Sequence, residues 1–163
     1  MVCPEECWPY VRESMLKTLT VTNTGMAVAI DVGSTNTIHP TNKRDLGQRL
    51  SLWARSCVYG EKLPWSGPLP SGHLFKPGEV QLSSTHTDGG LIAKGGALTG
   101  FELAGADRVW KPATARIAGD KVVVSSSEVK QPVAARYAWH ADPKANLYNG
   151  AGLPASPFRT DNW

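Results

Sequence analysis

The chain has 163 residues, of which 41% are apolar and 19% are charged, and its formal net charge is +3 at pH 7. This composition is typical of a globular protein and excludes an intrinsically disordered one. No apolar run approaches the roughly 20 residues of a membrane-spanning helix, and the acidic start MVCPEECW does not resemble a signal peptide. Because Lys and Arg are spread along the chain, we expect no nucleic-acid partner. Because no apolar run is long enough, we also expect no membrane partner.

The first predicted element is a helix over residues 8–19, WPYVRESMLKTL. Its apolar residues have the spacing of one helical face, at Val11, Met15, Leu16 and Leu19. Pro9 suits the first turn, where its missing N–H leaves no intrahelical bond unmade. The following TNTG favours a break in the chain.

A strand is predicted next, over the continuous apolar run MAVAIDV at residues 26–32. Such a run suits a strand covered on both faces, as in parallel sheets. After the loop GSTNTIHP, apolar residues again keep a helical spacing from Leu46 to Val58. Asn42 is the expected N-cap of this second helix, and Gly60 is expected to end it. Helix, strand, loop and helix together indicate part of a doubly wound α/β sheet.

The remainder of the chain has the pattern of β structure. Residues 64–78 are rich in Pro and Gly and are predicted to form a linker. Beyond it, short runs alternate apolar and polar residues, and Gly119-Asp120 is predicted to be a hairpin turn between two of them. A further predicted strand, PVAARYAWH, places on one face Val133, Ala135, Tyr137 and Trp139. Short alternating strands with frequent turns favour an antiparallel β-sandwich.

These patterns divide the chain into three parts. Residues 1–63 are predicted to be the C-terminal end of an α/β domain, residues 64–78 a linker, and residues 79–163 a small antiparallel β-sandwich domain. One predicted strand cannot make a sheet, and no further βαβ units follow it. The α/β part is therefore expected to lack its N-terminal strands, whereas the β part is expected to be whole.

The three cysteines predict neither a disulfide framework nor a metal site. Cys3 and Cys7 are four residues apart, and no pair of histidines completes a set of ligands for zinc. Cys57 falls on the apolar face of the second predicted helix, where we expect a buried free thiol.

His39 is the leading candidate for a catalytic residue. Its loop follows a predicted strand and precedes a helix, the place where active sites of open α/β sheets lie. An imidazole there can take a proton from a serine hydroxyl and return it to a leaving alcohol. The ring then needs an orienting acceptor, for which Asp31 and Asn36 are the local candidates. The alternative is a structural or solvated histidine.

A nucleophile is not apparent in the sequence. The chain has no G-x-S-x-G block. Ser34 shares the loop of His39, but a serine that stabilises a turn explains it better. Three further histidines are expected at the surface, namely His73, His86 and His140. Arg136 and Arg159 are expected to form structural ion pairs, and core packing is favoured over sugar stacking for Trp110, Tyr137 and Trp139.

Longer stretches of the chain, from Trp8 to Asp161, resemble the sialate O-acetylesterases of the SGNH hydrolase superfamily. In the first half the similar stretches are WPYVRESMLKTL, NTGMAVAIDVG and IHPTNKRDLGQRLSLWARSCVYGE. In the second half they are THTDGGLIAKGG, LTGFELAGAD and RYAWHADPKANLYNGAGLPASPFRTD. The motifs IHPxNK and GLPAxPFRTD are the most specific when they occur together.

The resemblance implies an SGNH-type, flavodoxin-like α/β domain with added β structure. It implies a serine esterase without cofactor or metal that hydrolyses O-acetyl esters on sialic acid or related sugars. His39 matches the catalytic histidine of the family's IHP motif. Asp31 is our expected orienting group, with Asn36 in support.

Parts of the family's catalytic machinery have no match in the chain. These are the serine block, near a Gly-Gln-Ser-Asn motif, and the blocks that form the oxyanion hole. The upstream part of the esterase domain is therefore an expected partner, in cis or in trans, and the chain alone is expected to be inactive. Members of the family are often secreted, periplasmic or lysosomal, and the chain itself indicates no compartment.

A hypothesis from another class is a noncatalytic carbohydrate-binding β-sandwich with a vestigial α/β segment. The sugar platform of such a module would consist of Tyr137, Trp139 and Tyr148. The DNA upstream of Met1 would discriminate between the two hypotheses. An open reading frame with a Gly-Gln-Ser-Asn block would support the esterase, whereas a stop codon with an independent promoter would support the binding module.

Overall fold

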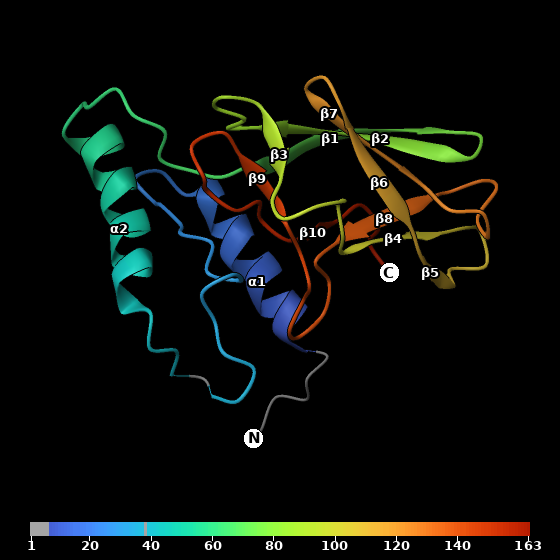
Figure 1. The fold of residues 1–163 in the computed structure, drawn as a ribbon, viewed down its shortest axis with the longest axis horizontal. Helices are drawn as coiled ribbons and strands as arrows, with labels where there is room; N and C mark the ends of the chain where they lie inside the picture. The colour runs from blue at the N-terminus through green and yellow to red at the C-terminus, as the bar shows by residue number, and fades with distance from the viewer. Residues whose placement is uncertain (1–6, 38) are drawn as a thin grey trace.

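The computed structural model describes residues 7–37 and 39–163, which form two short helices and three antiparallel sheets. The helices are α1 (Trp8–Lys17) and α2 (Lys43–Trp53), each continued by a short turn of another helical type, Thr18–Thr20 and Ala54–Val58. The strands are β1 (Leu69–Lys76), β2 (Glu79–Thr85), β3 (Leu91–Ala93), β4 (Phe101–Ala104), β5 (Trp110–Pro112), β6 (Thr114–Ala118), β7 (Lys121–Ser125), β8 (Ala134–Tyr137), β9 (Leu147–Asn149) and β10 (Phe158–Arg159). Both helices lie on one side of the molecule and the sheets on the other (Figure 1).

Both predicted helices are confirmed, together with their local start signals. Pro9 lies in the first turn of α1. The Asn42 side chain accepts a hydrogen bond from the Asp45 N–H at 3.2 Å, which caps α2 as expected. Gly60, with φ of 74°, follows the last helical turn. None of the helices in the described part of the chain combines the length and apolar character that a membrane crossing requires.

The predicted strand at residues 26–32 is wrong. This segment has irregular backbone and turns, and no described strand lies beside it to supply ladder hydrogen bonds. Its contacts are instead with α2: the Trp53 ring lies over Gly25, and Arg49 donates a hydrogen bond to the Val28 carbonyl at 2.6 Å. An apolar run becomes a strand only where a neighbouring strand pairs with it. Here the Arg49 side chain bonds to the backbone instead.

Each of the two larger sheets has four strands, in the orders β1-β2-β7-β6 and β10-β8-β4-β5, and β3 pairs with β9 in the third sheet. The predicted hairpin at Gly119-Asp120 is confirmed, because β6 and β7 pair on either side of it. Residues 69–76 form the edge strand β1, although the prolines and glycines of residues 64–78 favoured a linker. Pro70 lacks an N–H, a lack that an edge strand tolerates, and the register shifts between Pro70 and Gly72. The division of the chain into domains stays a prediction.

One hydrophobic core receives side chains from both larger sheets. The alternating apolar residues of β2 and β7 are buried in it as predicted, among them Val80, Leu82, Val122 and Val124. The other sheet contributes Phe101, Leu103, Ala135, Tyr137 and Phe158. Val133 was expected on the same face as Tyr137, but it precedes the first residue of β8 and is 44% exposed.

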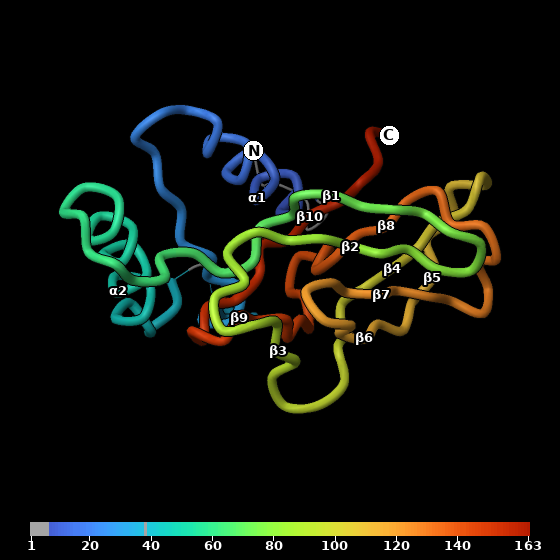
Figure 2. The backbone as a smooth tube through the Cα atoms, turned by 90° about the horizontal axis from the view of Figure 1, so that it is seen from above, coloured from blue at the N-terminus to red at the C-terminus, as the bar shows by residue number. Residues whose placement is uncertain are grey.

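The helix α1 lies next to the β part (Figures 1 and 2), and charged and aromatic side chains join the two. Arg159 of β10 makes an ion pair with Glu13 at 2.9 Å. The Arg12 guanidinium donates a hydrogen bond to the His140 carbonyl at 2.7 Å, and Tyr10 meets the Trp139 ring edge-on. The helical part thus contacts the β part directly.

The two described cysteines, Cys7 and Cys57, are free thiols. Cys57 is exposed, contrary to the prediction, and the segment Ala54–Val58 that carries it has no buried residue. Cys3 lies outside the described residues. Within residues 7–37 and 39–163, no three His, Cys, Asp or Glu side chains are close enough to hold a metal ion.

Candidate active site

The loop at residues 31–40 passes between α2 and the β part. His39 lies near its end, and the His39 side chain is exposed. Its backbone N–H donates to the Thr37 hydroxyl at 3.1 Å. The ring makes no hydrogen bond to another group in the described part of the chain. The imidazole is therefore open to groups that approach this loop from outside.

Asp31 lies at the start of the same loop and bonds to two other elements. Arg49 of α2 grips the carboxylate with two parallel hydrogen bonds, of 2.6 and 2.7 Å. The Tyr148 hydroxyl of β9 donates a third, at 3.1 Å. The Asp31 and Arg49 side chains are only 15% and 12% exposed. Paired carboxylate–guanidinium bonds of this kind fix orientation as well as distance.

The contacts among Asp31, Arg49 and Tyr148 lower the pKa of Asp31 and raise that of Tyr148. Burial alone would raise the pKa of Asp31, but the hydrogen bonds and charge of Arg49, together with the Tyr148 hydroxyl, hold it below its ordinary value. Burial and the Asp31 charge raise the pKa of Tyr148 to about 12. Asp31 is therefore ionised at neutral pH, and Tyr148 is the hydrogen-bond donor.

A second contact holds the loop against the segment between β8 and β9. The Thr35 hydroxyl donates to the Asp142 carboxylate at 2.9 Å. The same segment is also bonded by Arg12 of α1, at the carbonyls of His140 and Ala141. The loop and α1 thus both contact this connection in the β part.

The three site residues expected from the sequence are not bonded to one another. Both oxygens of Asp31 are engaged by Arg49 and Tyr148, and Asn36 is exposed in a turn. No hydrogen bond joins either side chain to the His39 ring within the described residues. The Ser34 hydroxyl accepts from the Asn36 N–H at 3.4 Å, which matches the prediction of a turn serine.

Arg49 was not foreseen as a site residue, and Tyr148 was named only in the sugar platform of the alternative hypothesis. Arg49 stands among the apolar residues Leu46 and Leu50 of a predicted helix, which hinted at a buried guanidinium. Nothing near Tyr148 in the sequence points to Asp31, because 117 positions separate the two residues.

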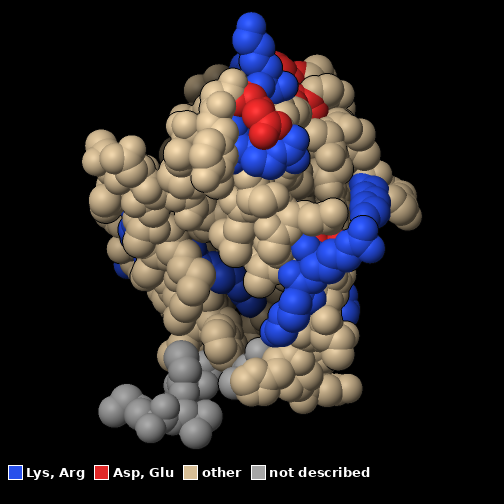
Figure 3. Space-filling view, turned by 90° about the vertical axis from the view of Figure 1, so that its left-hand side faces the viewer, with Lys and Arg blue, Asp and Glu red and all other residues tan. Residues whose placement is uncertain are grey.

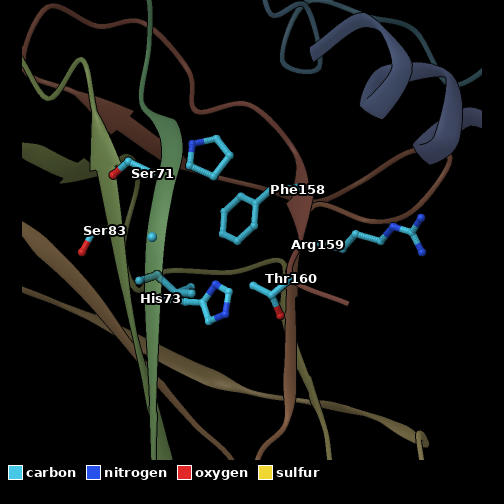
Figure 4. Close-up of a pocket in the computed structure, with 9 residues that line it drawn as sticks. Ser71, His73, Ser83, Phe158, Arg159 and Thr160 are labelled. Carbon is cyan, nitrogen blue, oxygen red and sulfur yellow. The ribbon is translucent and has the colours of Figure 1, made fainter. Parts of the chain in front are cut away.

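An open groove of about 340 Å³ lies between the edge strands β1 and β10, and it includes none of residues 31–40. Figure 4 shows His73 and Ser71 on one wall and Phe158 and Thr160 on the other. His73, expected at the surface of a linker, is thus on β1. Arg159 also borders the groove, but its guanidinium is bonded to Glu13 and Asp161.

The sugar platform proposed for a noncatalytic module is wrong. Tyr137 is fully buried, and Trp139 and Tyr148 are each 6% exposed, so none presents a face to a ligand. Core packing, the favoured interpretation of Tyr137 and Trp139, is confirmed. The predicted structural ion pairs are also confirmed: Arg136 bonds to Glu102 at 2.8 Å, and Arg159 bonds to Glu13.

Comparison with known proteins shows first which class of enzyme the chain resembles. No family model matches the chain. The chain superposes on a carbohydrate acetylesterase from Xanthomonas citri with a TM-score of 0.94 and 48% sequence identity, covering 99% of this chain and 38% of that one. The chain therefore shares its arrangement of sheets and helices with part of a carbohydrate acetylesterase.

Curated relatives point to a narrower family within this class, the sialate O-acetylesterases. The mouse sialate O-acetylesterase is 32% identical over 151 residues, and the human enzyme is 31% identical over the same length. Each match covers 83% of this chain. The chain is thus related to the sialate O-acetylesterases over most of its length, which confirms the family resemblance. It spans only 28% of the mouse enzyme and 29% of the human enzyme.

Proposed function

We propose that the chain is the C-terminal part of a carbohydrate acetylesterase that hydrolyses O-acetyl esters on sialic acid or a related sugar. The observation that carries the proposal is the match to the Xanthomonas citri acetylesterase along 99% of the chain. Within that enzyme, residues 1–63 would complete an SGNH-type α/β domain, and the two larger sheets would form an adjoining β-sandwich.

In the proposed reaction His39 is the general base and acid. Its neutral imidazole takes the proton of a serine hydroxyl as the oxygen attacks the acetyl carbonyl, and returns that proton to the sugar oxygen as the ester bond breaks. Water then releases the acetyl group by the same proton transfers. The exposed position of His39 supports this role, because the serine and the oxyanion-hole donors would come from an upstream segment.

The helical side of the molecule is the proposed contact surface for that segment. It carries exposed large apolar residues, of which Met15 of α1 is 54% exposed and Leu50 of α2 is 51% exposed. The others on this side are Trp8, Tyr10, Val11, Val21, Val58 and Tyr59. Figure 3 shows this side, where uncharged residues make up most of the surface. Apolar side chains gathered on one side of a molecule are typical of an interface. The proposed occupant is the upstream esterase segment, since relatives are more than three times the length matched here.

A chimera tests the proposal. The part of the Xanthomonas citri acetylesterase that this chain matches would be replaced by the 163 residues, and hydrolysis of an O-acetylated sugar would be measured. We expect the chimera to be active and the chain alone to be inactive. His39→Ala should lower kcat by roughly 10³- to 10⁶-fold, as removal of a triad base does.

The matched control is His73→Ala on β1, which should retain the chimera's activity. Near-normal kcat in the His39→Ala chimera would mean that His39 has a structural role and not a catalytic one. Acetylesterase activity of the isolated chain would show that it contains a nucleophile of its own.

A further inference from the structure

We propose that Asp31, Arg49 and Tyr148 form a loop anchor, a set of positioning residues that fixes the loop of His39 against the β part. The inference rests on the proposed function, because it assigns a role toward His39. It differs from the sequence-based expectation that Asp31 orients the His39 ring directly. With this anchor, the position of His39 depends in part on β9, a strand of the β part.

The geometry joins three elements at one carboxylate. Asp31 opens the loop, Arg49 comes from the middle of α2, and Tyr148 comes from the middle of β9. Their hydrogen bonds measure 2.6, 2.7 and 3.1 Å. Arg49 also holds the Val28 carbonyl just before the loop. One guanidinium therefore fixes both the backbone and the side chain at the point where the loop begins.

Both carboxylate oxygens of Asp31 are hydrogen-bonded to groups other than the His39 imidazole. One of its oxygens accepts from Arg49, and the other accepts from Arg49 and Tyr148. A carboxylate held in this way can act on His39 only through the loop backbone. Because the pair is largely withdrawn from water, loss of one partner would leave the other charge poorly compensated.

A second tether makes the anchor effective at His39, eight positions further along the chain. Thr35 bonds to Asp142, and Asp142 lies in the segment that leads into β9. The loop is therefore held at residue 31 and again at residue 35, both times by the β part. The tether at Thr35 lies close in the sequence to Lys43, where α2 begins. Displacements of about 1 Å in a catalytic group can reduce the rate by roughly 10²-fold.

The test uses Tyr148→Phe and Arg49→Lys in the active chimera. Phenylalanine fills the same space without the hydroxyl, and lysine keeps the charge without the paired bonds. We expect each to lower kcat by roughly 10- to 100-fold with KM nearly unchanged, since the anchor positions a reacting group and not the sugar. Arg49→Ala should lose more activity than Arg49→Lys. The control, Arg116→Lys on the exposed part of β6, should leave kcat unchanged.

The pH profile separates positioning from direct orientation. If Asp31 contacted the imidazole, Asp31→Asn would lower the apparent pKa of the acidic limb of kcat/KM, because the imidazolium would lose a neighbouring charge. For an anchor, we expect kcat to fall while this pKa keeps its value to within a few tenths of a unit. A clear downward shift of that pKa would overturn the proposal.

The anchor can also be detected in the isolated chain without activity. Tyr148 should ionise near pH 12, and Asp31→Asn should lower that pKa by removing the adjacent negative charge. Ultraviolet absorbance of the phenolate, with Tyr148→Phe as the reference, measures it. Unchanged ionisation of Tyr148 in Asp31→Asn would overturn the proposed contact. Wild-type kcat in both Tyr148→Phe and Arg49→Lys would overturn the anchor, whereas an active His39→Ala chimera would overturn the proposed function.

Discussion

Single polar side chains decide much of how the irregular segments of this protein are held. Asn149 is fully buried in β9. Its amide N–H groups donate to the carbonyls of Ser66 and His86, both at 2.9 Å, and its oxygen accepts from the Leu153 N–H at 3.0 Å. One amide therefore bonds backbone groups of three segments, which are buried or partly buried.

Asn149→Ala should lower the free energy of unfolding by more than about 2 kcal/mol, because it leaves buried backbone donors and acceptors without partners. Chemical denaturation of the isolated chain measures the loss. The matched control is Asn36→Ala at an exposed turn, which we expect to change stability by less than about 0.5 kcal/mol. Equal effects of the two substitutions would contradict the role given to Asn149.

The sequence could not predict these residues for a physical reason. The groups that satisfy Asn149 and Asp31 come from positions far away in the chain, up to 117 residues in the case of Tyr148. A single sequence contains no local pattern that encodes such a pairing. His39 was singled out by its loop and by the family's IHP motif, while the interactions that hold the loop emerged only in the structure.

Among the elements, those governed by neighbours in sequence were predicted best. Asn42 caps α2 through a residue three positions away, and the turn at Gly119-Asp120 joins two adjacent strands. The run at residues 26–32 has an apolar composition suited to a strand, yet pairing depends on a neighbour that the pattern does not reveal. The edge strand β1 was missed for the converse reason, since the prolines and glycines of residues 64–78 suggested a linker.

Close backbone contact between two segments fixes the entry to β1. A Cβ atom on Gly67 would lie 2.0 Å from the carbonyl oxygen of Pro154. Gly67→Ala should therefore lower the thermal midpoint, with a loss of more than about 2 kcal/mol, because backbone and not a flexible side chain must move. Gly72→Ala in β1, where the added methyl group meets no atom within 4 Å, is the control. A midpoint unchanged in Gly67→Ala would mean that the two segments separate easily.

The ion pair between α1 and β10 makes stability depend on pH. Hydrogen bonding to Arg159 lowers the pKa of Glu13, against the opposing effect of burial. A carboxyl group with a lowered pKa in the folded state contributes stability above its unfolded pKa of about 4.3, and that contribution is lost as the pH falls through the folded value. The free energy of unfolding should decline below about pH 4.3, and less steeply in Glu13→Gln. Denaturation at several pH values between 7 and 3 measures both slopes. Parallel slopes would mean that this pair contributes little.

In the whole molecule, core packing is unevenly distributed between the two sides. The sheets share one core that includes Val80, Leu103 and Tyr137, whereas α2 has no buried residue and α1 buries only Pro9. A helix packed so lightly contributes little hydrophobic stabilisation and is expected to open before the core strands do. The apolar side chains that it exposes are those proposed to meet the upstream segment.

Hydrogen exchange should therefore separate the two sides of the isolated chain. Amides of α2 should exchange well before those of β2 and β7, because opening α2 exposes little apolar surface. In the acetylesterase chimera, the α2 amides should become strongly protected while those of β2 and β7 change little. Mass spectrometry of peptides over residues 43–58, 79–85 and 121–125 measures this difference in the two proteins. If α2 exchanges as slowly as β7 in the isolated chain, or gains no protection in an active chimera, the helical side is not the surface that the upstream segment covers.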